Sequence, residues 1–240
     1  TGDFDNDGYL DILSASGEKY ETESDCKIAW YRNTDGKGTF GKQRIVTIDL
    51  LTPTSVTAGD FDGDGNLDVA SASFVDDKIA WYRNIDGKGN FGPQIVVSTT
   101  AIGACCVVIA DFNQDGFLDL ASASQTDGKI AWYKNLDGKG TFSPENVITT
   151  DPKSKTWNVV VSDLNGDGRL DLISSTAYKN IHNVIAWYEN IGGASTFRTS
   201  RSDVWYSQND GYSAVSGDFD GDGWNDLASA SFGKSRIEWY

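Results

Sequence analysis

GDFDGDGNLDVASAS, residues 59–73, has close relatives elsewhere in a chain of 240 residues, at 2–16, 110–124, 162–176 and 217–231. The first aspartate of each copy lies at position 3, 60, 111, 163 or 218, so the copies are 57, 51, 52 and 55 residues apart. Self-similarity at a period of about 50 residues is typical of proteins built from stacked or circularly arranged units. The sequence therefore predicts five related structural units.

Two further motifs recur within these units. IAWY begins at residues 28, 79, 130 and 185, with the variant IEWY at 237, and DGKG begins at residues 35, 86 and 137. Aromatic and β-branched residues favour strands, clustered glycines favour turns, and no segment shows a sustained helical period. In the second unit, these patterns predict four strands at 56–61, 67–73, 78–84 and 91–97.

Four short strands per unit without a helix favour an all-β fold, namely a β-propeller of four-stranded blades. We expect a single domain over residues 1–240, with units at about 1–55, 56–107, 108–159 and 160–213 and an incomplete unit at 214–240. The first unit lacks most of its opening strand and the last lacks its fourth. Because a closed ring pairs every edge, we expect flanking sequence or further blades to complete it, and the chain to be part of a longer protein.

The recurring aromatic and glycine motifs each have a structural and a ligand-binding interpretation. The IAWY and IEWY tetrads could form an aromatic ligand platform, but we expect them to be buried between neighbouring blades. DGKG resembles a phosphate-binding loop, yet it lacks the strand-to-helix context that such loops need. We therefore expect each DGKG to be a hairpin turn with glycine at positive φ.

Between the first two strands of each unit lies the nine-residue pattern D-x-[DN]-x-D-G-x-x-D. Alternate residues point hard oxygens toward one centre, the glycine at position 6 permits a sharp turn, and the carbonyl at position 7 can add another oxygen. Several protein oxygens on a flexible loop suit Ca²⁺, whereas Mg²⁺ keeps more water. The predicted side-chain ligands are Asp3, Asp5, Asp7 and Asp11; Asp60, Asp62, Asp64 and Asp68; Asp111, Asn113, Asp115 and Asp119; Asp163, Asn165, Asp167 and Asp171; and Asp218, Asp220, Asp222 and Asp226.

Charge repulsion indicates that these loops need a cation. Two carboxylates about 4 Å apart repel by about 1 kcal/mol in water and about 4 kcal/mol at an effective dielectric constant of about 20. An EF-hand shares the opening pattern but requires an acid at position 12 and a following helix, where this chain has serine within a strand-like segment. Metal-free acidic turns are the alternative, and five copies in register argue against it. The serines are Ser14, Ser71, Ser122, Ser174 and Ser229.

These motifs resemble the FG-GAP/VCBS repeat family, the calcium-loop β-propellers related to the head of the integrin α-subunit. The resemblance covers essentially the whole chain. It implies about five Ca²⁺ ions, one per repeat, held by side chains at positions 1, 3, 5 and 9 and by the carbonyl at position 7. It also implies an extracellular or cell-surface setting and often seven blades, whereas this chain has five repeats. The matching carbonyls are those of Tyr9, Asn66, Phe117, Arg169 and Trp224.

Composition excludes several classes of function. The formal net charge is −15, from 35 acidic and 20 basic residues, which argues against nucleic acid or an anionic membrane as a partner. No run of 18 apolar residues predicts a membrane-spanning segment. The single histidine, His182, has no accompanying nucleophile motif, so we expect no enzyme activity. Cys105 and Cys106 could form a vicinal disulfide or remain thiols.

Loop lengths indicate which face would bind a partner. In an up-and-down blade, the acidic loops and the DGKG turns share one face, and the loop between the second and third strands lies on the other. That second loop has 5 residues in three copies, 8 in the fourth and 11 in the first, residues 17–27. Variable loops often carry function, although ordinary drift in length is the alternative. Four aromatic residues are expected in blade-to-blade connections of that face: Trp157, Trp205, Tyr206 and Tyr212.

We therefore expect a calcium-stabilised extracellular β-propeller that serves as a structural or protein-interaction module in an adhesive cell-surface, matrix or filament protein. It would bind proteins or glycans through the face opposite the acidic loops, with no catalytic residues and no membrane insertion. The alternatives are a lectin-like glycan-binding propeller and the non-catalytic scaffold of a polysaccharide lyase.

Overall fold

The computed structural model describes residues 1–17, 25–178, 183–193, 197–198, 202–207, 211–231 and 236–240. Its described part is all-β and contains no α-helix, and in particular no helix long and apolar enough to cross a membrane. The strands form five antiparallel sheets, and in each sheet the strands lie in chain order. This is the arrangement expected when turn-rich segments connect strands that are adjacent in sequence.

Sheet 1 contains β1 (Ile12–Ser16), β2 (Lys27–Tyr31) and β3 (Arg44–Thr47). Sheet 2 contains β4 (Pro53–Gly59), β5 (Asp68–Ser73), β6 (Lys78–Tyr82) and β7 (Ile95–Ser98). Sheet 3 contains β8 (Ala104–Ala110), β9 (Asp119–Ser124), β10 (Lys129–Tyr133) and β11 (Asn146–Thr149). Sheet 4 contains β12 (Ser154–Ser162), β13 (Asp171–Tyr178), β14 (Asn183–Tyr188) and β15 (Ser202–Ser207). Sheet 5 contains β16 (Gly211–Gly217), β17 (Asp226–Ser231) and β18 (Arg236–Trp239).

The predicted strands of the second unit agree with sheet 2 in number and order, but their ends differ. The first strand begins at Pro53 instead of residue 56 and ends before the acidic loop. The fourth begins at Ile95 instead of residue 91, because Phe91 forms only an isolated bridge to Asn84 that closes the preceding turn. As expected, the first and last sheets have three strands each.

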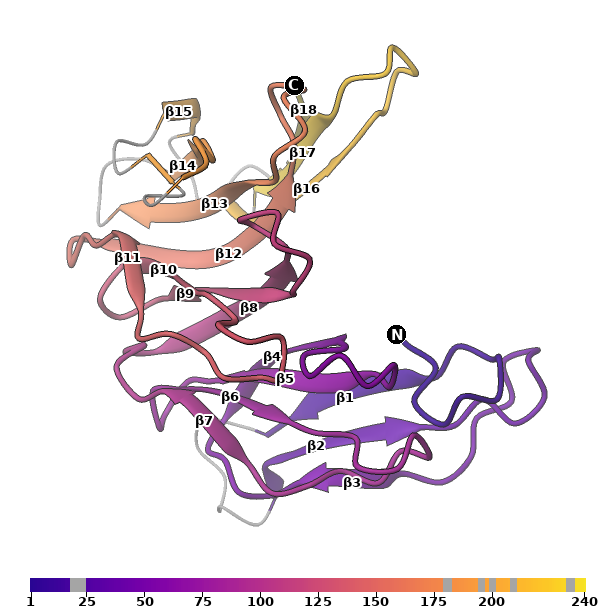
Figure 1. Ribbon diagram of the computed structural model, residues 1–240. Coiled ribbons are helices and arrows are strands. Elements are labelled where there is room, and N and C mark those ends of the chain that lie inside the picture. The colour runs from indigo at the N-terminus through magenta and orange to yellow at the C-terminus, as the bar shows by residue number, and fades with distance from the viewer. Residues whose placement is uncertain (18–24, 179–182, 194–196, 199–201, 208–210, 232–235) are drawn as a thin grey trace.

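Neighbouring sheets meet along their first strands. β4 lies beside β8, β8 beside β12, and β12 beside β16, while β1 of the three-stranded first sheet lies near β4. Figure 1 shows the sheets following one another along a curve, from the indigo N-terminal sheet to the yellow C-terminal one. A groove of about 380 Å³ is lined by residues of β4, β8, β12 and β16, so these four strands face a common space.

The hydrophobic core lies between consecutive sheets, where the third-strand aromatics are buried as predicted. Trp30 of β2 packs in one cluster with Val69 and Tyr82 of sheet 2, and Phe4 lies with its ring centroid 5.8 Å from that of Trp30. The tetrad of the last sheet differs, because Ile237 is 79% exposed and Trp239 is 58% exposed. Burial of the motif therefore depends on a following sheet that covers it.

Candidate metal sites in the acidic loops

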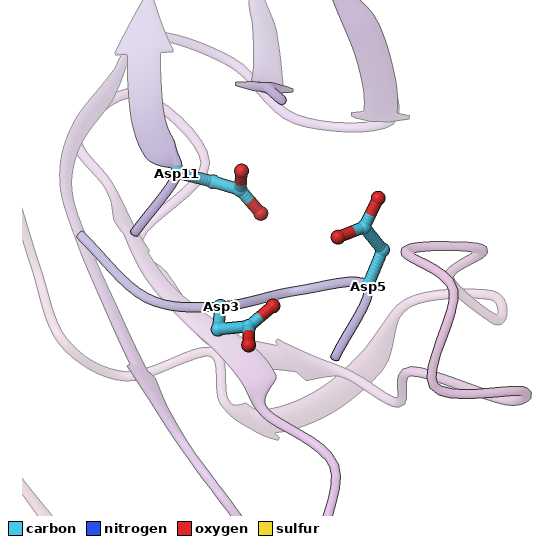
Figure 2. Close-up of side chains that lie close together, drawn as sticks. All are labelled: Asp3, Asp5 and Asp11. Atoms are coloured by element: carbon cyan, nitrogen blue, oxygen red, sulfur yellow. The ribbon is translucent and has the colours of Figure 1, made fainter. Parts of the chain in front are cut away.

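We number the acidic loops 1 to 5, for residues 3–11, 60–68, 111–119, 163–171 and 218–226. In loop 1, Asp3, Asp5 and Asp11 bring one carboxylate oxygen each to within 4.8 Å of one another. Figure 2 shows their carboxylates turned toward a common space. Loops 2 and 5 contain the same grouping at positions 1, 3 and 9. The further members are Asp60, Asp62 and Asp68, and Asp218, Asp220 and Asp226.

The carboxylate of the first aspartate accepts backbone hydrogen bonds from residues of its own loop. In loop 2, Asp60 Oδ1 accepts the backbone N–H groups of Gly63 at 2.7 Å and Asp64 at 3.2 Å. Asp60 Oδ2 accepts the N–H of Gly65 at 2.9 Å. Gly65 has a φ of 85°, which favours glycine at position 6 because other residues are strained there. The local sequence therefore closes the loop with backbone donors on one carboxylate.

The ninth aspartate lies at the start of the second strand and is buried in loops 1 to 4. Asp68 accepts the backbone N–H of Phe61 at 3.0 Å and of Asn84 at 2.8 Å. Burial raises the pKa of Asp68 to about 7, although these hydrogen bonds oppose the shift, and burial raises the pKa of Asp119 in loop 3 to about 7 as well. Without a cation, the folded protein thus disfavours the charge that each of these carboxylates would carry at neutral pH.

The fifth aspartate lies outside the three-carboxylate group in loops 1, 2 and 5, although the sequence places it among the predicted ligands. In loop 2, Asp64 Oδ1 accepts the N–H of Asn66 at 2.9 Å. Asp64 Oδ2 pairs with Arg83 at 3.0 Å. Both oxygens of this carboxylate thus have a partner in the described loop. A ligand role for position 5 stays a prediction, as do the carbonyls at position 7.

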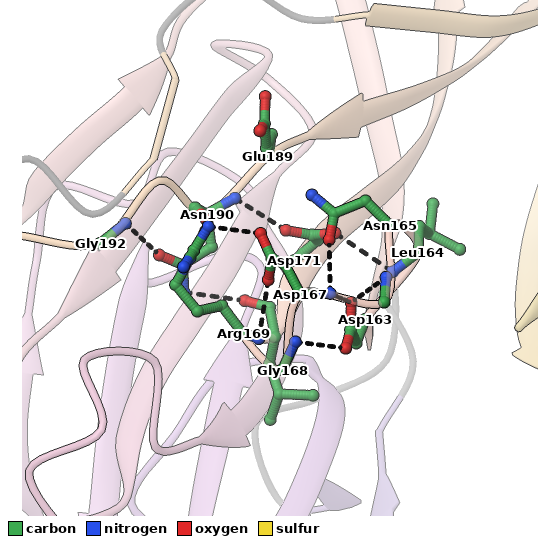
Figure 3. Close-up of polar contacts among 12 residues, drawn as sticks. Asp163, Leu164, Asn165, Asp167, Gly168, Arg169, Asp171, Glu189, Asn190 and Gly192 are labelled. Carbon is green, nitrogen blue, oxygen red and sulfur yellow. Dashed lines mark hydrogen bonds and ion pairs between the residues drawn. The ribbon is translucent and has the colours of Figure 1, made fainter. Parts of the chain in front are cut away.

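Loops 3 and 4 carry asparagine at position 3. Asn113 Oδ1 accepts the N–H of Asp115 at 3.0 Å, and Asn165 Oδ1 accepts the N–H of Asp167 at 3.1 Å. Figure 3 shows the network of loop 4, in which Asp163, Asn165 and Asp171 surround the turn. The backbone fold therefore matches that of the other loops, but these two loops bring one carboxylate fewer.

One set of residues at the loops was not singled out from the sequence. In units 2 to 4, the asparagine after the IAWY-containing strand contacts two units at once. Asn135 Nδ2, for example, donates to the carbonyl of Phe61 at 2.9 Å and to that of Leu118 at 3.3 Å. Its backbone N–H donates to Asp119, the ninth residue of loop 3, at 2.8 Å. The sequence signal was present as an asparagine two residues after each IAWY tyrosine. The equivalent residues are Asn33, Asn84, Asn135 and Asn190.

The donor set fits a hard divalent cation. Carboxylate oxygens are the ligands such ions prefer, and Asp5 Oδ1 is a buried oxygen without a hydrogen-bond partner among the described residues. A buried, unpartnered carboxylate oxygen is costly unless a positive charge faces it. The acidic loops can therefore hold a metal through positions 1, 3 and 9.

The acidic loops and the DGKG turns share a face, as predicted. A Cβ atom added to Gly36 would lie 2.5 Å from the Tyr9 ring of loop 1, and one added to Gly138 would lie 2.3 Å from the Phe117 ring of loop 3. The turn glycines have positive φ, for example 63° at Gly87. These contacts confirm the turn prediction and the assignment of the loops to one end of the sheets.

The opposite end of the sheets carries a cleft of about 400 Å³, beside the start of β4. Of the four aromatic residues predicted to lie in connections of that face, all lie in strands: Trp157 in β12, Trp205 and Tyr206 in β15, and Tyr212 in β16. The prediction was wrong on this point because the first and fourth strands extend further than the sequence suggested. The cleft is lined by Thr52, Thr54, Phe74, Cys105, Gln125 and Trp157.

The remaining candidate residues are the three cysteines and His182. Cys26, Cys105 and Cys106 are free thiols, and burial raises the pKa of Cys105 and Cys106, which disfavours the reactive thiolate. His182 and most of the 17–27 loop lie outside the described residues.

Comparisons with known proteins agree with this geometry. A model of the FG-GAP-like repeat matches residues 3–71, 60–122 and 111–174. Each match begins at the first aspartate of one acidic loop and runs through the next loop into the strand that follows it. No curated protein matches the chain.

The fold is similar to that of an Agrocybe aegerita lectin that recognises non-reducing terminal N-acetylglucosamine. The two are 21% identical with a TM-score of 0.60, over 95% of this chain and 58% of the lectin. The V. cholerae biofilm matrix protein Bap1 is 19% identical with a TM-score of 0.49, over 95% of this chain and 33% of Bap1. The exotype rhamnogalacturonan lyase YesX is 15% identical with a TM-score of 0.45, over 89% of this chain and 48% of the lyase.

Proposed function

The chain belongs to the FG-GAP-like repeat family, and from that premise we propose that it is a calcium-stabilised β-propeller module. The five sheets are its blades, and β4, β8, β12 and β16 are inner strands around the axis. The common groove that these four strands line supports this arrangement. The neighbouring second strands β5, β9 and β17 consist largely of alanine and serine, which also supports it, because the taper toward a propeller axis leaves little room for large side chains.

The observation that carries the calcium assignment is the grouping of three carboxylates at positions 1, 3 and 9 in loops 1, 2 and 5. Their ninth-position members in loops 1 and 2, Asp11 and Asp68, are fully buried. Ca²⁺ accepts several protein oxygens in irregular geometry, whereas Mg²⁺ demands near-octahedral geometry and keeps several waters. Five bound Ca²⁺ ions would change the formal net charge from −15 to −5.

A calcium titration by calorimetry on the parent chain, Asp68→Asn and Asp86→Asn tests this assignment. Asp86 is an exposed carboxylate of the neighbouring DGKG turn, so its removal controls for the loss of one negative charge. We expect binding of several Ca²⁺ ions by the parent and Asp86→Asn chains, and weakened or lost binding at one site in Asp68→Asn. A parent chain that binds no Ca²⁺ at millimolar concentration would contradict the assignment.

The biological role that we propose is structural or adhesive, in an extracellular or cell-surface protein, without enzyme activity. Near-identical repeats and a single histidine support a non-catalytic role, because a catalytic centre needs a constellation of differing residues in one unit. Millimolar Ca²⁺ outside cells would fill even weak sites. The chain covers 58% of the lectin that it resembles and smaller shares of the matrix protein and the lyase. Any partner of the whole protein is therefore part of this proposal.

Glycan binding is a second candidate function, favoured by the cleft on the face opposite the acidic loops. The pairing of β4, β8 and β12 with their neighbours shifts register across Thr54, Cys105 and Trp157, so each is the extra residue of a β-bulge. Bulges re-aim side chains and are common beside binding sites. These three bulge residues line the cleft with Phe74 and Gln125, and aromatic faces beside uncharged polar groups suit a sugar ring.

A glycan array with the parent chain and Trp157→Ala tests the second candidate. We expect Trp157→Ala to lose binding to any glycan that the parent chain binds. Its melting temperature should equal that of the parent chain. Thr126→Ala, outside the cleft lining, is the control. A parent chain that retains no glycan, or a Trp157→Ala chain that binds like the parent, would contradict glycan binding at the cleft.

A further inference from the structure

A basic side chain pairs with the fifth-position aspartate in each of the first four acidic loops. In loops 1 to 3 it comes from the residue that follows the IAWY tyrosine, outside the loop itself. In loop 4 it comes from position 7 of the loop. The pairs are Arg32 with Asp7, Arg83 with Asp64, Lys134 with Asp115 and Arg169 with Asp167.

The geometry in loop 2 shows what this cation does to the carboxylates. Arg83 pairs with Asp64 Oδ2 at 3.0 Å and also with Oδ2 of Asp62, the third residue of the loop. Asp64 Oδ1 is taken by the N–H of Asn66 at 2.9 Å. The guanidinium of Arg83 thus contacts the second oxygen of Asp64. It also contacts Asp62, which belongs to the three-carboxylate group.

In the fourth unit, a different residue supplies the positive charge that pairs with the fifth-position aspartate. Glu189 follows its IAWY tyrosine, where the first three units have Arg32, Arg83 and Lys134. In this unit Arg169 carries the positive charge instead: it pairs with Asp167 Oδ2 and donates from Nε to the carbonyl of Asn190 at 2.8 Å (Figure 3). Where Glu189 stands in place of the basic residue, Arg169 supplies the positive charge. The fifth-position carboxylate of loop 4, Asp167, therefore still has a cationic partner.

We propose that these four side chains are internal counter-cations that lower the affinity of loops 1 to 4 for divalent ions. This inference rests on the proposed ion-binding function. Each cation stabilises the ion-free loop by pairing with its fifth-position carboxylate, and Arg32 and Arg83 pair with the third-position carboxylate as well.

Two physical effects act in the same direction. An ion that recruits Asp64 Oδ2 competes with Arg83 for that oxygen, so the stability of the pair subtracts from binding. The positive charge of Arg83 also repels a divalent cation placed among the carboxylates, and this repulsion acts even if the pair persists. Removal of the cation should therefore increase affinity at its own loop.

Each loop contains its own reporter for such a test. The backbone N–H at position 6 donates to the first aspartate, as in Gly65 to Asp60 at 2.9 Å and Gly116 to Asp111 at 2.8 Å. Amide NMR signals of these glycines should respond to Ca²⁺ loop by loop. The five reporters are Gly8, Gly65, Gly116, Gly168 and Gly223.

The experiment is a Ca²⁺ titration of the ¹⁵N-labelled chain and of Arg83→Gln. The side chain of Arg83 is half exposed, so the substitution should not impair folding. We expect the midpoint for Gly65 to shift to about 5-fold lower Ca²⁺, as for an ion pair of about 1 kcal/mol, while the Gly8 and Gly116 midpoints stay unchanged. Lys134→Gln should shift Gly116 in the same way and leave Gly65 unchanged.

Two control variants separate the specific contact from charge in general. Arg83→Lys should retain the parent midpoint at Gly65, because Lys134 performs the role in loop 3. Lys88→Gln removes an exposed cation of the adjacent turn and should leave the Gly65 midpoint in place. A Gly65 midpoint that is unchanged or higher in Arg83→Gln would overturn the proposal, the higher value indicating that Arg83 orients the ligands instead.

Failure of this inference is distinguishable from failure of the proposed function. If no glycine reporter of the parent chain responds to Ca²⁺, the ion-binding function itself is wrong. If the parent reporters respond but Arg83→Gln and Lys134→Gln leave their own loops unchanged, only the counter-cation role is wrong.

Discussion

The side-chain amide of Asn84 donates a 2.9 Å hydrogen bond to the carbonyl oxygen of Phe4, a residue 80 positions earlier in the chain. Phe4 belongs to acidic loop 1 and Asn84 follows the third strand of sheet 2, so the bond joins the loop of one sheet to the next sheet. The same bond links Asn135 to Phe61 at 2.9 Å. It also links Asn190 to Phe112 at 2.7 Å, so this contact repeats at the three junctions among the first four units.

Asn84→Ala should lower the free energy of unfolding by about 3 kcal/mol, because it leaves the buried carbonyl of Phe4 and the N–H of Gly87 without partners. Asn33→Ala is the matched control. Asn33 has the same place in sheet 1, but its Nδ2 donates only to Leu10 within its own unit. Urea unfolding of both variants measures the difference, and equal losses would show that the bond between sheets contributes nothing.

Gly89→Ala should destabilise the protein far more than Gly38→Ala. The two glycines occupy the same place in successive DGKG turns, with φ of 74° and 91°, so each substitution costs about 1–2 kcal/mol in backbone strain. A Cβ at position 89 would also lie 2.0 Å from the Trp30 ring of the preceding sheet, whereas position 38 has nothing within 4 Å. We expect an additional loss of about 2 kcal/mol or more for Gly89→Ala. Similar melting temperatures would contradict the packing of Trp30 against this turn.

The stability of the chelator-treated protein should fall as the pH rises from 5 to 8. The pKa of Asp68 and that of Asp119 are both about 7 in the folded chain, above the ordinary value of 3.8, because burial disfavours the charged form. A raised folded pKa contributes stability below the unfolded value, and that contribution is lost as the pH rises through 7.

With Ca²⁺ present the trend in this pH range should weaken or reverse, because the ion binds the deprotonated carboxylates. Thermal unfolding across the pH range, with chelator and with Ca²⁺, measures both trends. Asp68→Asn should have a shallower slope in chelator than Asp86→Asn, and identical slopes would argue against the raised pKa of Asp68.

Chelation should also lower the melting temperature at neutral pH. An ion that binds only the folded state adds about 2.7 kcal/mol per site at about 100 times its dissociation constant. Scanning calorimetry in Ca²⁺, in Mg²⁺ and in excess chelator tests this, with restoration on adding Ca²⁺ back as the control. If the three melting curves coincide, the acidic loops have no ion-dependent structural role.

The residues of each unit were sufficient to predict the local structure. The four strands, the turn at DGKG, the acidic loop and the burial of Trp30 and Trp81 all follow from patterns within about 50 consecutive residues. Hydrophobic alternation, glycine conformation and the spacing of aspartates act over such short distances. This explains why strand number and order agree with the structure, while strand ends such as Pro53 differ by a few residues.

Relations between units were decided only by the tertiary structure. Asn33 has the same motif position in the sequence as Asn84, yet only Asn84 donates its side-chain amide to the preceding unit, at the carbonyl of Phe4. Trp239 belongs to the same motif as Trp81, yet it is exposed because no described sheet covers it. Hydrogen bonds and charge pairs depend on atomic positions set by the packing of strands distant in sequence, whereas the repeating pattern specifies only each unit's own backbone. The sequence by itself thus determined the units and their acidic loops, and the packing of sheet against sheet determined which motif aromatics are buried and which asparagines join two units.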